Sequence, residues 1–113
     1  MWLGSATIPL GSGKLSLLSI ERRLSPNFGP RKGGVLPSLI VVHYTAMPDA
    51  QAALERLSDP AHEVSAHYLL DQSGGAVQLV PEAQRAWHAG AGAWGDCTDI
   101  NSASIGIELC NAG

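Results

Sequence analysis

The sequence is poor in charge, in cysteine and in long apolar runs. Its 113 residues carry a net charge of −3, and no run of lysine and arginine is longer than two residues. A phosphate backbone needs a basic surface, so nucleic acid is excluded as a partner. Two cysteines, Cys97 and Cys110, are too few for a disulfide framework, and they leave open one bridge or two free thiols. No apolar run is long enough to cross a bilayer, which excludes an integral membrane segment in this chain.

The first 20 residues differ from an export signal although several of them are apolar. They lack a basic start, and Pro9, Gly11 and Gly13 interrupt the apolar stretch. We therefore expect residues 1–24 to form a poorly ordered extension and residues 25–113 to form one folded unit. A cytoplasmic location is the expectation that follows, with the periplasm or the cell wall as the alternative.

What the sequence does contain is a short apolar run at residues 39–45, LIVVHYT, which carries a histidine near its end. The run does not alternate between apolar and polar residues, which predicts a central strand buried on both faces of a sheet. Because His43 stands at the exit of this strand, it is well placed to be a metal ligand or a catalytic base. The alternative is a core histidine whose ring nitrogens are hydrogen-bonded inside the protein.

Other segments predict the elements around this strand. A helix is expected from Asp49, a candidate N-cap, to about Leu57, with Pro60 as its stop. Residues 64–70 and 76–80 are predicted to form a β-hairpin. A short strand is expected at 85–88 and a longer one at 104–110. The three prolines and three glycines of residues 25–38 predict a loop without regular elements.

Four blocks of the sequence carry a family resemblance. They are VVHYTAM, VSAHYLLDQSGGAVQLV, RAWHAGAGAW and INSASIGIELCNAG. In their order and spacing they resemble the type 2 N-acetylmuramoyl-L-alanine amidases, the zinc-dependent family related to phage T7 lysozyme and to the peptidoglycan recognition proteins. The resemblance implies an α/β fold with a mixed central β-sheet flanked by helices and a Zn2+ ion at the edge of the sheet. It also implies hydrolysis of the amide that joins the lactyl group of N-acetylmuramic acid to L-alanine.

The chemistry of amide hydrolysis matches two residues of these blocks. Zinc makes bound water a better nucleophile and polarises the carbonyl, and a carboxylate must then carry a proton from the water to the leaving nitrogen. His43 matches the family's first zinc ligand, and Glu108 matches its catalytic glutamate. Alternation along the last strand puts Glu108 and Gly106 on one face, which we expect to open to the cleft. The alternative for Glu108 is a solvated edge residue.

Four further residues are candidates for supporting roles. His67 matches the histidine of the family's SAHY block and is expected to orient a site residue or to be structural. Trp87 and His88, in the WHAG block, are expected to form a cleft wall that contacts the muramyl sugar or the peptide, with core packing as the alternative for Trp87. Asn101 is a further candidate for substrate contact.

The family's remaining zinc ligands, a second histidine and a final aspartate or cysteine, lie downstream of the block that ends at Gly113. A catalytic zinc site needs three protein ligands. We therefore expect the C-terminal part of the domain to be missing, and we expect this chain alone to bind zinc weakly and to be inactive. The alternative function is a non-catalytic peptidoglycan-binding module. The complete domain is expected to be a monomer whose partner is peptidoglycan or a muropeptide.

Overall fold

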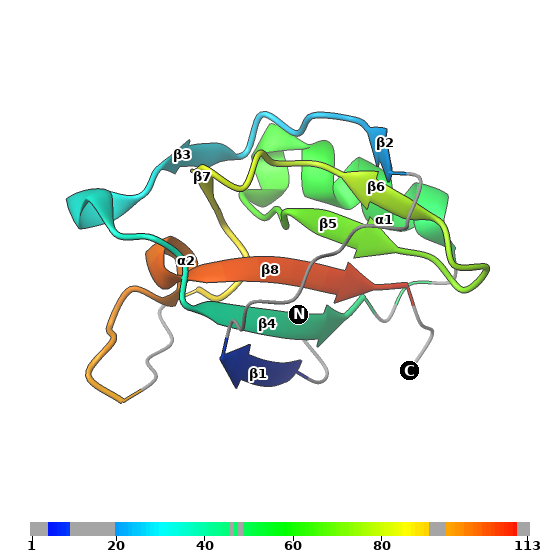
Figure 1. The fold of residues 1–113 in the computed structure, drawn as a ribbon. Helices are drawn as coiled ribbons and strands as arrows, with labels where there is room; N and C mark the ends of the chain where they lie inside the picture. Colours follow the sequence, from blue (N-terminus) through cyan, green and yellow to red (C-terminus); the bar gives the residue numbers. More distant parts are fainter. Residues whose placement is uncertain (1–4, 10–19, 46, 48, 91–94, 111–113) are drawn as a thin grey trace.

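The structure, a computed structural model, describes residues 5–9, 20–45, 47, 49–90 and 95–110. Its centre is a six-stranded sheet with the strand order β1-β4-β8-β5-β6-β2 (Figure 1). The β1–β4 and β5–β6 pairs are antiparallel, and the other neighbours are parallel. The strands are β1 (Ser5–Pro9), β2 (Ile20–Arg22), β4 (Leu39–Tyr44), β5 (Tyr68–Leu70), β6 (Ala76–Gln78) and β8 (Ser104–Leu109). The expected α/β fold with a mixed central sheet is confirmed.

Helix α1 (Ala50–Ser58) packs on one face of this sheet, behind it in the view of Figure 1. The carboxylate of Asp49 accepts a hydrogen bond from the amide of Ala52 at 2.8 Å, so the predicted N-cap is confirmed. The apolar side of the helix buries Leu57 against Leu69 of β5 and Leu79. Burying a leucine side chain contributes about 2 kcal/mol, so this contact holds the helix to the sheet.

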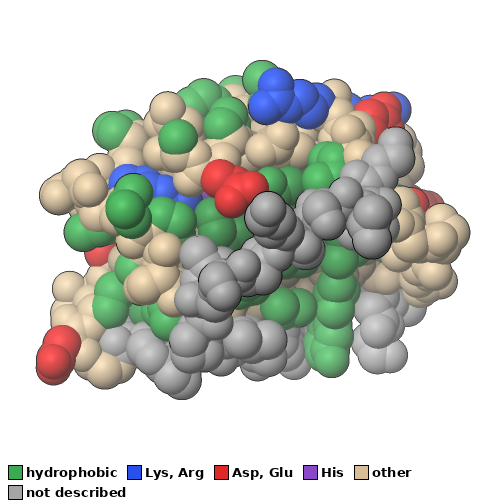
Figure 2. Space-filling view, viewed as in Figure 1, with side chains coloured by type: hydrophobic (Ala, Val, Ile, Leu, Met, Phe, Trp, Pro, Cys, Tyr) green, Lys and Arg blue, Asp and Glu red, His purple; other side chains and the backbone are tan. Residues whose placement is uncertain are grey.

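Strand β4 lies inside the sheet, but its burial differs from the prediction. Its alternate residues Leu39, Val41 and His43 are buried, whereas Ile40 and Val42 are half-buried. We name the face that carries His43, and that α1 covers, the inner face, and we name the opposite one the outer face. Figure 2 shows hydrophobic side chains over the outer face. The prediction of a central strand buried on both faces was therefore wrong, because β8 holds the central place and β4 fully buries one face only.

Two expectations about the N-terminal residues also need correction. Strands β1 and β2 both belong to residues 1–24, which were expected to lie outside the folded unit, and both hydrogen-bond to the sheet. Residues 25–38 contain β3 (Phe28–Pro30) and the 3-10 turn η1 (Lys32–Gly34). Proline is tolerated at the end of such a short edge strand because only one ladder hydrogen bond is lost. These segments form strands because they pair with strands that are distant in the sequence. The local sequence pattern does not reveal such partners.

The second half of the chain follows the prediction more closely. The hairpin of β5 and β6 forms, and β7 (Gln84–Ala86) pairs with β3 in a separate two-stranded sheet. Helix α2 (Ile100–Ala103) leads directly into β8. Both cysteines are free thiols. In the described part of the chain, no helix is long and apolar enough to cross a membrane.

Candidate active site

His43 and Glu108 are brought together by the parallel pairing of β4 with β8. The two residues are partners in the register of these strands. Because register partners in neighbouring strands point to the same side of a sheet, both side chains lie on the inner face. They are buried, with 4% and 5% of their surfaces exposed. The two residues that the family resemblance singles out are therefore neighbours in space, although they are far apart in the sequence.

The carboxyl of Glu108 is enclosed rather than open to a cleft. Only 5% of the residue is exposed, so the expectation that this face opens around Glu108 is not met. Its Oε2 atom has no hydrogen-bond partner among the described residues. Burial raises the pKa of Glu108 to about 8, and the charge of Arg56 opposes this rise. A carboxyl in this environment can take up and release a proton near neutral pH.

The ring of His88 lies on the inner face above Gly106. A side chain at Gly106 would overlap this ring, so only glycine leaves room for it. The Nδ1 atom of His88 is 3.1 Å from Nε2 of His43, and its Nε2 atom is 2.8 Å from Oγ of Ser104. Only 1% of His88 is exposed, and both ring nitrogens are used inside the protein. The ring thus points into the protein, and a contact of His88 with the substrate stays a prediction.

Burial also sets the charge state of these two histidines. It lowers the pKa of His43 to about 4. It lowers the pKa of His88 to about 3, with a further contribution from the neighbouring His43. Both rings are neutral at pH 7, so each has one protonated and one unprotonated nitrogen.

Asn101 holds the backbone that carries His88. Its Oδ1 atom accepts hydrogen bonds from the amides of His88 at 3.0 Å and Ala89 at 2.8 Å. The residue is 5% exposed, and it also contributes to the lining of a pocket. A direct contact between Asn101 and a substrate stays a prediction, whereas its structural role is visible.

His67 connects β8 to β7. Its Nδ1 atom accepts the amide of Gly106 at 3.0 Å, so its Nε2 atom carries the proton and donates to the carbonyl of Gln84 at 2.8 Å. The nearby guanidinium of Arg31 is also a donor, so it cannot hydrogen-bond to this nitrogen. Because its ring is completely buried, the geometry favours the structural role among the two expected for His67.

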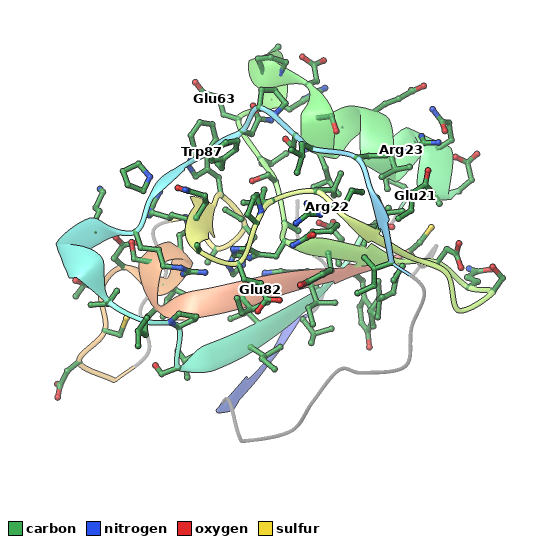
Figure 3. The ribbon with its side chains drawn as sticks, turned by 45° about the horizontal axis from the view of Figure 1, so that its top comes forward. Glu21, Arg22, Arg23, Glu63, Glu82 and Trp87 are labelled. Atoms are coloured by element: carbon green, nitrogen blue, oxygen red, sulfur yellow. The ribbon has the colours of Figure 1, made fainter. Side chains whose placement is uncertain are left out.

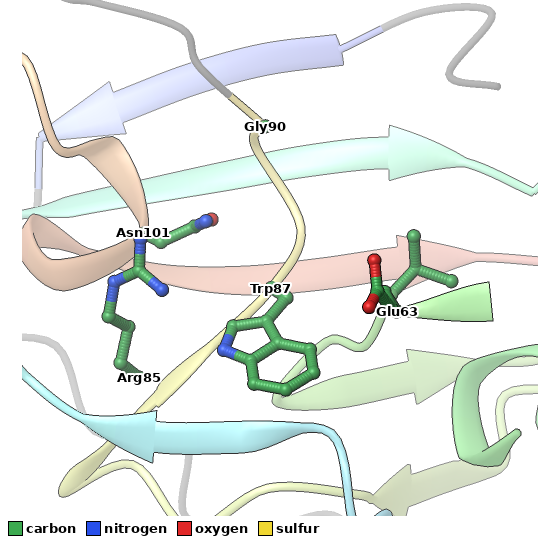
Figure 4. A pocket seen from close by; sticks show the side chains of 6 residues that line it. Glu63, Arg85, Trp87, Gly90 and Asn101 are labelled. Carbon is green, nitrogen blue, oxygen red and sulfur yellow. The ribbon is translucent and has the colours of Figure 1, made fainter. Parts of the chain in front are cut away.

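A pocket of about 420 Å3 lies beside the segment that carries Trp87 (Figure 4). The indole of Trp87 is half-buried, and Figure 3 shows it near Glu63. Arg85 contributes to the same pocket and forms an ion pair with Asp99 at 3.0 Å. A pocket with one aromatic wall and a few polar groups suits a small ligand, and the contact of Trp87 with a substrate stays a prediction. The complete lining is Glu63, Val64, Arg85, Trp87, Gly90 and Asn101.

Sequence reasoning missed Ser104, whose hydroxyl hydrogen-bonds to His88. The signal was present, because the alternation that puts Glu108 and Gly106 on one face puts Ser104 there as well. It also missed Arg85, the first residue of the RAWHAGAGAW block, which was expected only to belong to a short strand.

The described residues do not by themselves fit a complete zinc site. In the described ranges, no group of three or more histidine, cysteine, aspartate or glutamate side chains could hold a metal ion. Catalytic zinc takes three protein ligands, and His43 can supply one of them.

Comparison with known proteins identifies the family. The model of the N-acetylmuramoyl-L-alanine amidase family matches residues 33–113. The amidase AmiD of Escherichia coli is 44% identical over 82 residues, which cover 66% of this chain and 29% of AmiD. A crystal structure of an AmpD derivative is similar with a TM-score of 0.73 and 33% identity, covering 84% of this chain and 66% of that one.

A second solved structure is the complex of E. coli AmiD with the substrate anhydro-N-acetylmuramic acid-L-Ala-D-γ-Glu-L-Lys. It has a TM-score of 0.56 and 42% identity, and the match covers 80% of this chain and 35% of that one. This chain therefore spans less than two thirds of the length of each of these relatives. Together with the register of His43 and Glu108, the match over residues 33–113 shows that the chain belongs to the N-acetylmuramoyl-L-alanine amidase family.

Proposed function

We propose that the protein to which this chain belongs hydrolyses the amide between the lactyl group of N-acetylmuramic acid and L-alanine in peptidoglycan or in muropeptides. The observation that carries the proposal is the register pairing of His43 with Glu108 on the inner face, within a segment that matches the amidase family. The AmiD structure with an anhydro-muramyl peptide supports the substrate class.

Glu108 is proposed to carry the proton in this reaction. Water attacks the lactyl carbonyl and loses a proton to the Glu108 carboxylate, and the same carboxyl then gives the proton to the nitrogen of L-alanine as the C–N bond breaks. The products are a lactyl carboxylate and a peptide amine. A pKa of about 8 suits this double role, since both protonation states are accessible near neutral pH.

His43 is proposed to be one of the ligands of a zinc ion. When bound, zinc would polarise the carbonyl and lower the pKa of water. The described residues supply too few ligands for a complete site, so the roles proposed here are limited to those of the chain's own residues. His43 would offer an unprotonated ring nitrogen, and Glu108 would move the proton.

The test uses the complete reading frame that contains this chain, with the anhydro-muramyl tripeptide as substrate. Mass spectrometry should detect release of L-Ala-D-γ-Glu-L-Lys. Replacement Glu108→Gln should lower kcat by roughly a hundredfold or more, the usual scale for a positioned acid–base group. Glu55→Gln on the exposed side of α1 is the control and should keep the parent rate. Binding of the substrate without cleavage by the parent protein would refute the amidase and favour a peptidoglycan-binding module.

A further inference from the structure

We propose that His88 and Ser104 are positioning residues that fix the tautomer of His43. In this assignment His43 carries its proton on Nε2, and its Nδ1 atom is the unprotonated nitrogen. The hydrogen-bond assignments depend only on the structure. Their importance for catalysis rests on the proposed function, because it assumes that His43 belongs to the active site.

The direction of the hydrogen bonds is set at Ser104. Its Oγ atom lies 2.5 Å from the carbonyl oxygen of Ile100, and a carbonyl can only accept. The single hydroxyl proton of Ser104 is therefore used in this bond. Toward His88, at 2.8 Å, the hydroxyl oxygen must accept, so Nε2 of His88 carries a proton.

The position of the proton on His88 in turn determines the position of the proton on His43. The ring is buried, and in the described part of the chain no acidic side chain hydrogen-bonds to it, so it holds one proton only. Because that proton is on Nε2, the Nδ1 atom of His88 has a lone pair. It faces Nε2 of His43 at 3.1 Å, and that nitrogen must therefore be the donor. His43, also neutral, keeps Nδ1 unprotonated.

The surroundings prevent His88 from adopting another arrangement. Gly106 lets the ring lie directly against β8, and Asn101 holds the backbone on both sides of the Cα atom of His88. Turning the ring over would point carbon atoms at Ser104 and His43 and would leave buried polar atoms without partners, at a cost of about 1–3 kcal/mol each. Since the series of hydrogen bonds ends at a backbone carbonyl, it orients His43 and does not conduct protons to solvent.

The direct test is the nitrogen NMR spectrum of the histidine rings in the 15N-labelled 113-residue chain at pH 7. Long-range 15N–1H correlations distinguish protonated from unprotonated ring nitrogens. We expect His43, His67 and His88 to have the proton on Nε2. The exposed His62 is the internal control and should show averaged signals. A proton on Nδ1 of His43 would overturn the proposal without any need for a variant.

Substitutions distinguish a role in positioning His43 from a general effect on the stability of the fold. Ser104→Ala removes the acceptor of His88 Nε2, so a second tautomer of His43 should appear in the spectrum. Ser65→Ala, which removes an equally buried hydroxyl that bonds elsewhere, should leave the His43 tautomer unchanged. His88→Asn can still accept from His43 and should preserve its tautomer, which keeps the test decisive if Ser104→Ala fails to fold. An unchanged His43 signal in a folded Ser104→Ala chain would contradict the positioning role.

The kinetic measurement uses the complete reading frame. Ser104→Ala should lower kcat by about tenfold with little change in KM, the scale found when groups that orient a site histidine are removed. If the tautomers are as assigned but no form cleaves the muropeptide, the proposed function fails and the assignment stands. If the enzyme is active but Ser104→Ala keeps the parent kcat, the positioning role fails and the proposed function stands.

Discussion

The two ends of β8 present opposite environments on the same face of the sheet. At the Ser104 end, the hydroxyl and the His88 ring are hydrogen-bonded to protein groups, and Gly106 makes room for that ring. At the Glu108 end, the carboxyl is equally buried, but its Oε2 atom has no partner among the described residues. Only two strand positions separate Gly106 from Glu108, so the contrast comes from what packs over each position and not from depth alone.

This difference indicates that the two ends of β8 have different roles. A buried polar group whose hydrogen bonds are complete gives a unique, rigid structure. A buried carboxyl with an unsatisfied oxygen costs stability, and such groups with shifted pKa values concentrate at functional sites. The Ser104 end therefore positions His43, and the Glu108 end holds a group that can exchange a proton.

The largest expected effect comes from removing the ionisable carboxyl at the Glu108 end. The pKa of Glu108 rises from 4.5 to about 8 on folding, so the folded chain binds a proton that the unfolded chain releases between these pH values. The contribution of Glu108 to stability should be greatest below pH 4.5 and fall as the pH rises through 8, by up to about 5 kcal/mol. Glu108→Gln should abolish this fall.

Urea unfolding of the parent and of Glu108→Gln at pH 5 and pH 8.5, with a chelator present, measures this contribution as the difference between the two chains. The buried histidines, whose pKa values are lowered, affect both chains alike. Glu55→Gln on the exposed side of α1 is the charge-matched control and should keep the parent's pH dependence. If the stability of Glu108→Gln and of the parent changes equally between the two pH values, folding does not raise the pKa of Glu108.

The next effect tests the close packing at the Ser104 end. Gly106→Ala forces a methyl group into the His88 ring, which is held at both nitrogens and cannot move aside. Overpacking of this kind costs about 3 kcal/mol. Gly29→Ala in β3, where an added Cβ meets no atom within 4 Å, should change stability by less than about 1 kcal/mol. Equal unfolding free energies for the two variants would mean that His88 does not lie against β8.

A smaller effect is expected at Asn101. Asn101→Ala leaves the buried amide of His88 and the neighbouring amide of Ala89 without their acceptor. The free energy of unfolding should fall by about 2 kcal/mol, and the His43 signals should broaden as His88 becomes less fixed. Thermal unfolding together with the histidine NMR spectrum measures both. A stable variant with unchanged histidine signals would show that Asn101 does not hold this segment.

The sequence predicts best those parts that depend on local signals or on the family blocks. The cap at Asp49 and the hairpin around 71–75 follow from residue type and spacing. The neighbouring positions of His43 and Glu108 agree with the resemblance combined with simple alternation along β8.

The direction of the His88 side chain could not be predicted in this way. The WHAG block is a loop, and whether its histidine points outward or inward depends on Gly106, a residue of a strand that comes later in the chain. The pairing of β1, β2 and β3 was missed for the same physical reason. Each is a short segment whose partner is distant in sequence, and its local composition favours a loop or an extension.

The most direct test of this account is the titration of Glu108 itself. The 13C signal of its carboxyl carbon can be followed by NMR from pH 3 to pH 10 in the selectively labelled chain, and Glu108→Gln identifies the signal by its absence. We expect a midpoint near pH 8, caused by burial of the carboxyl. A midpoint near 4.5 would contradict it, because the carboxyl would then be ionised at neutral pH like any solvated side chain.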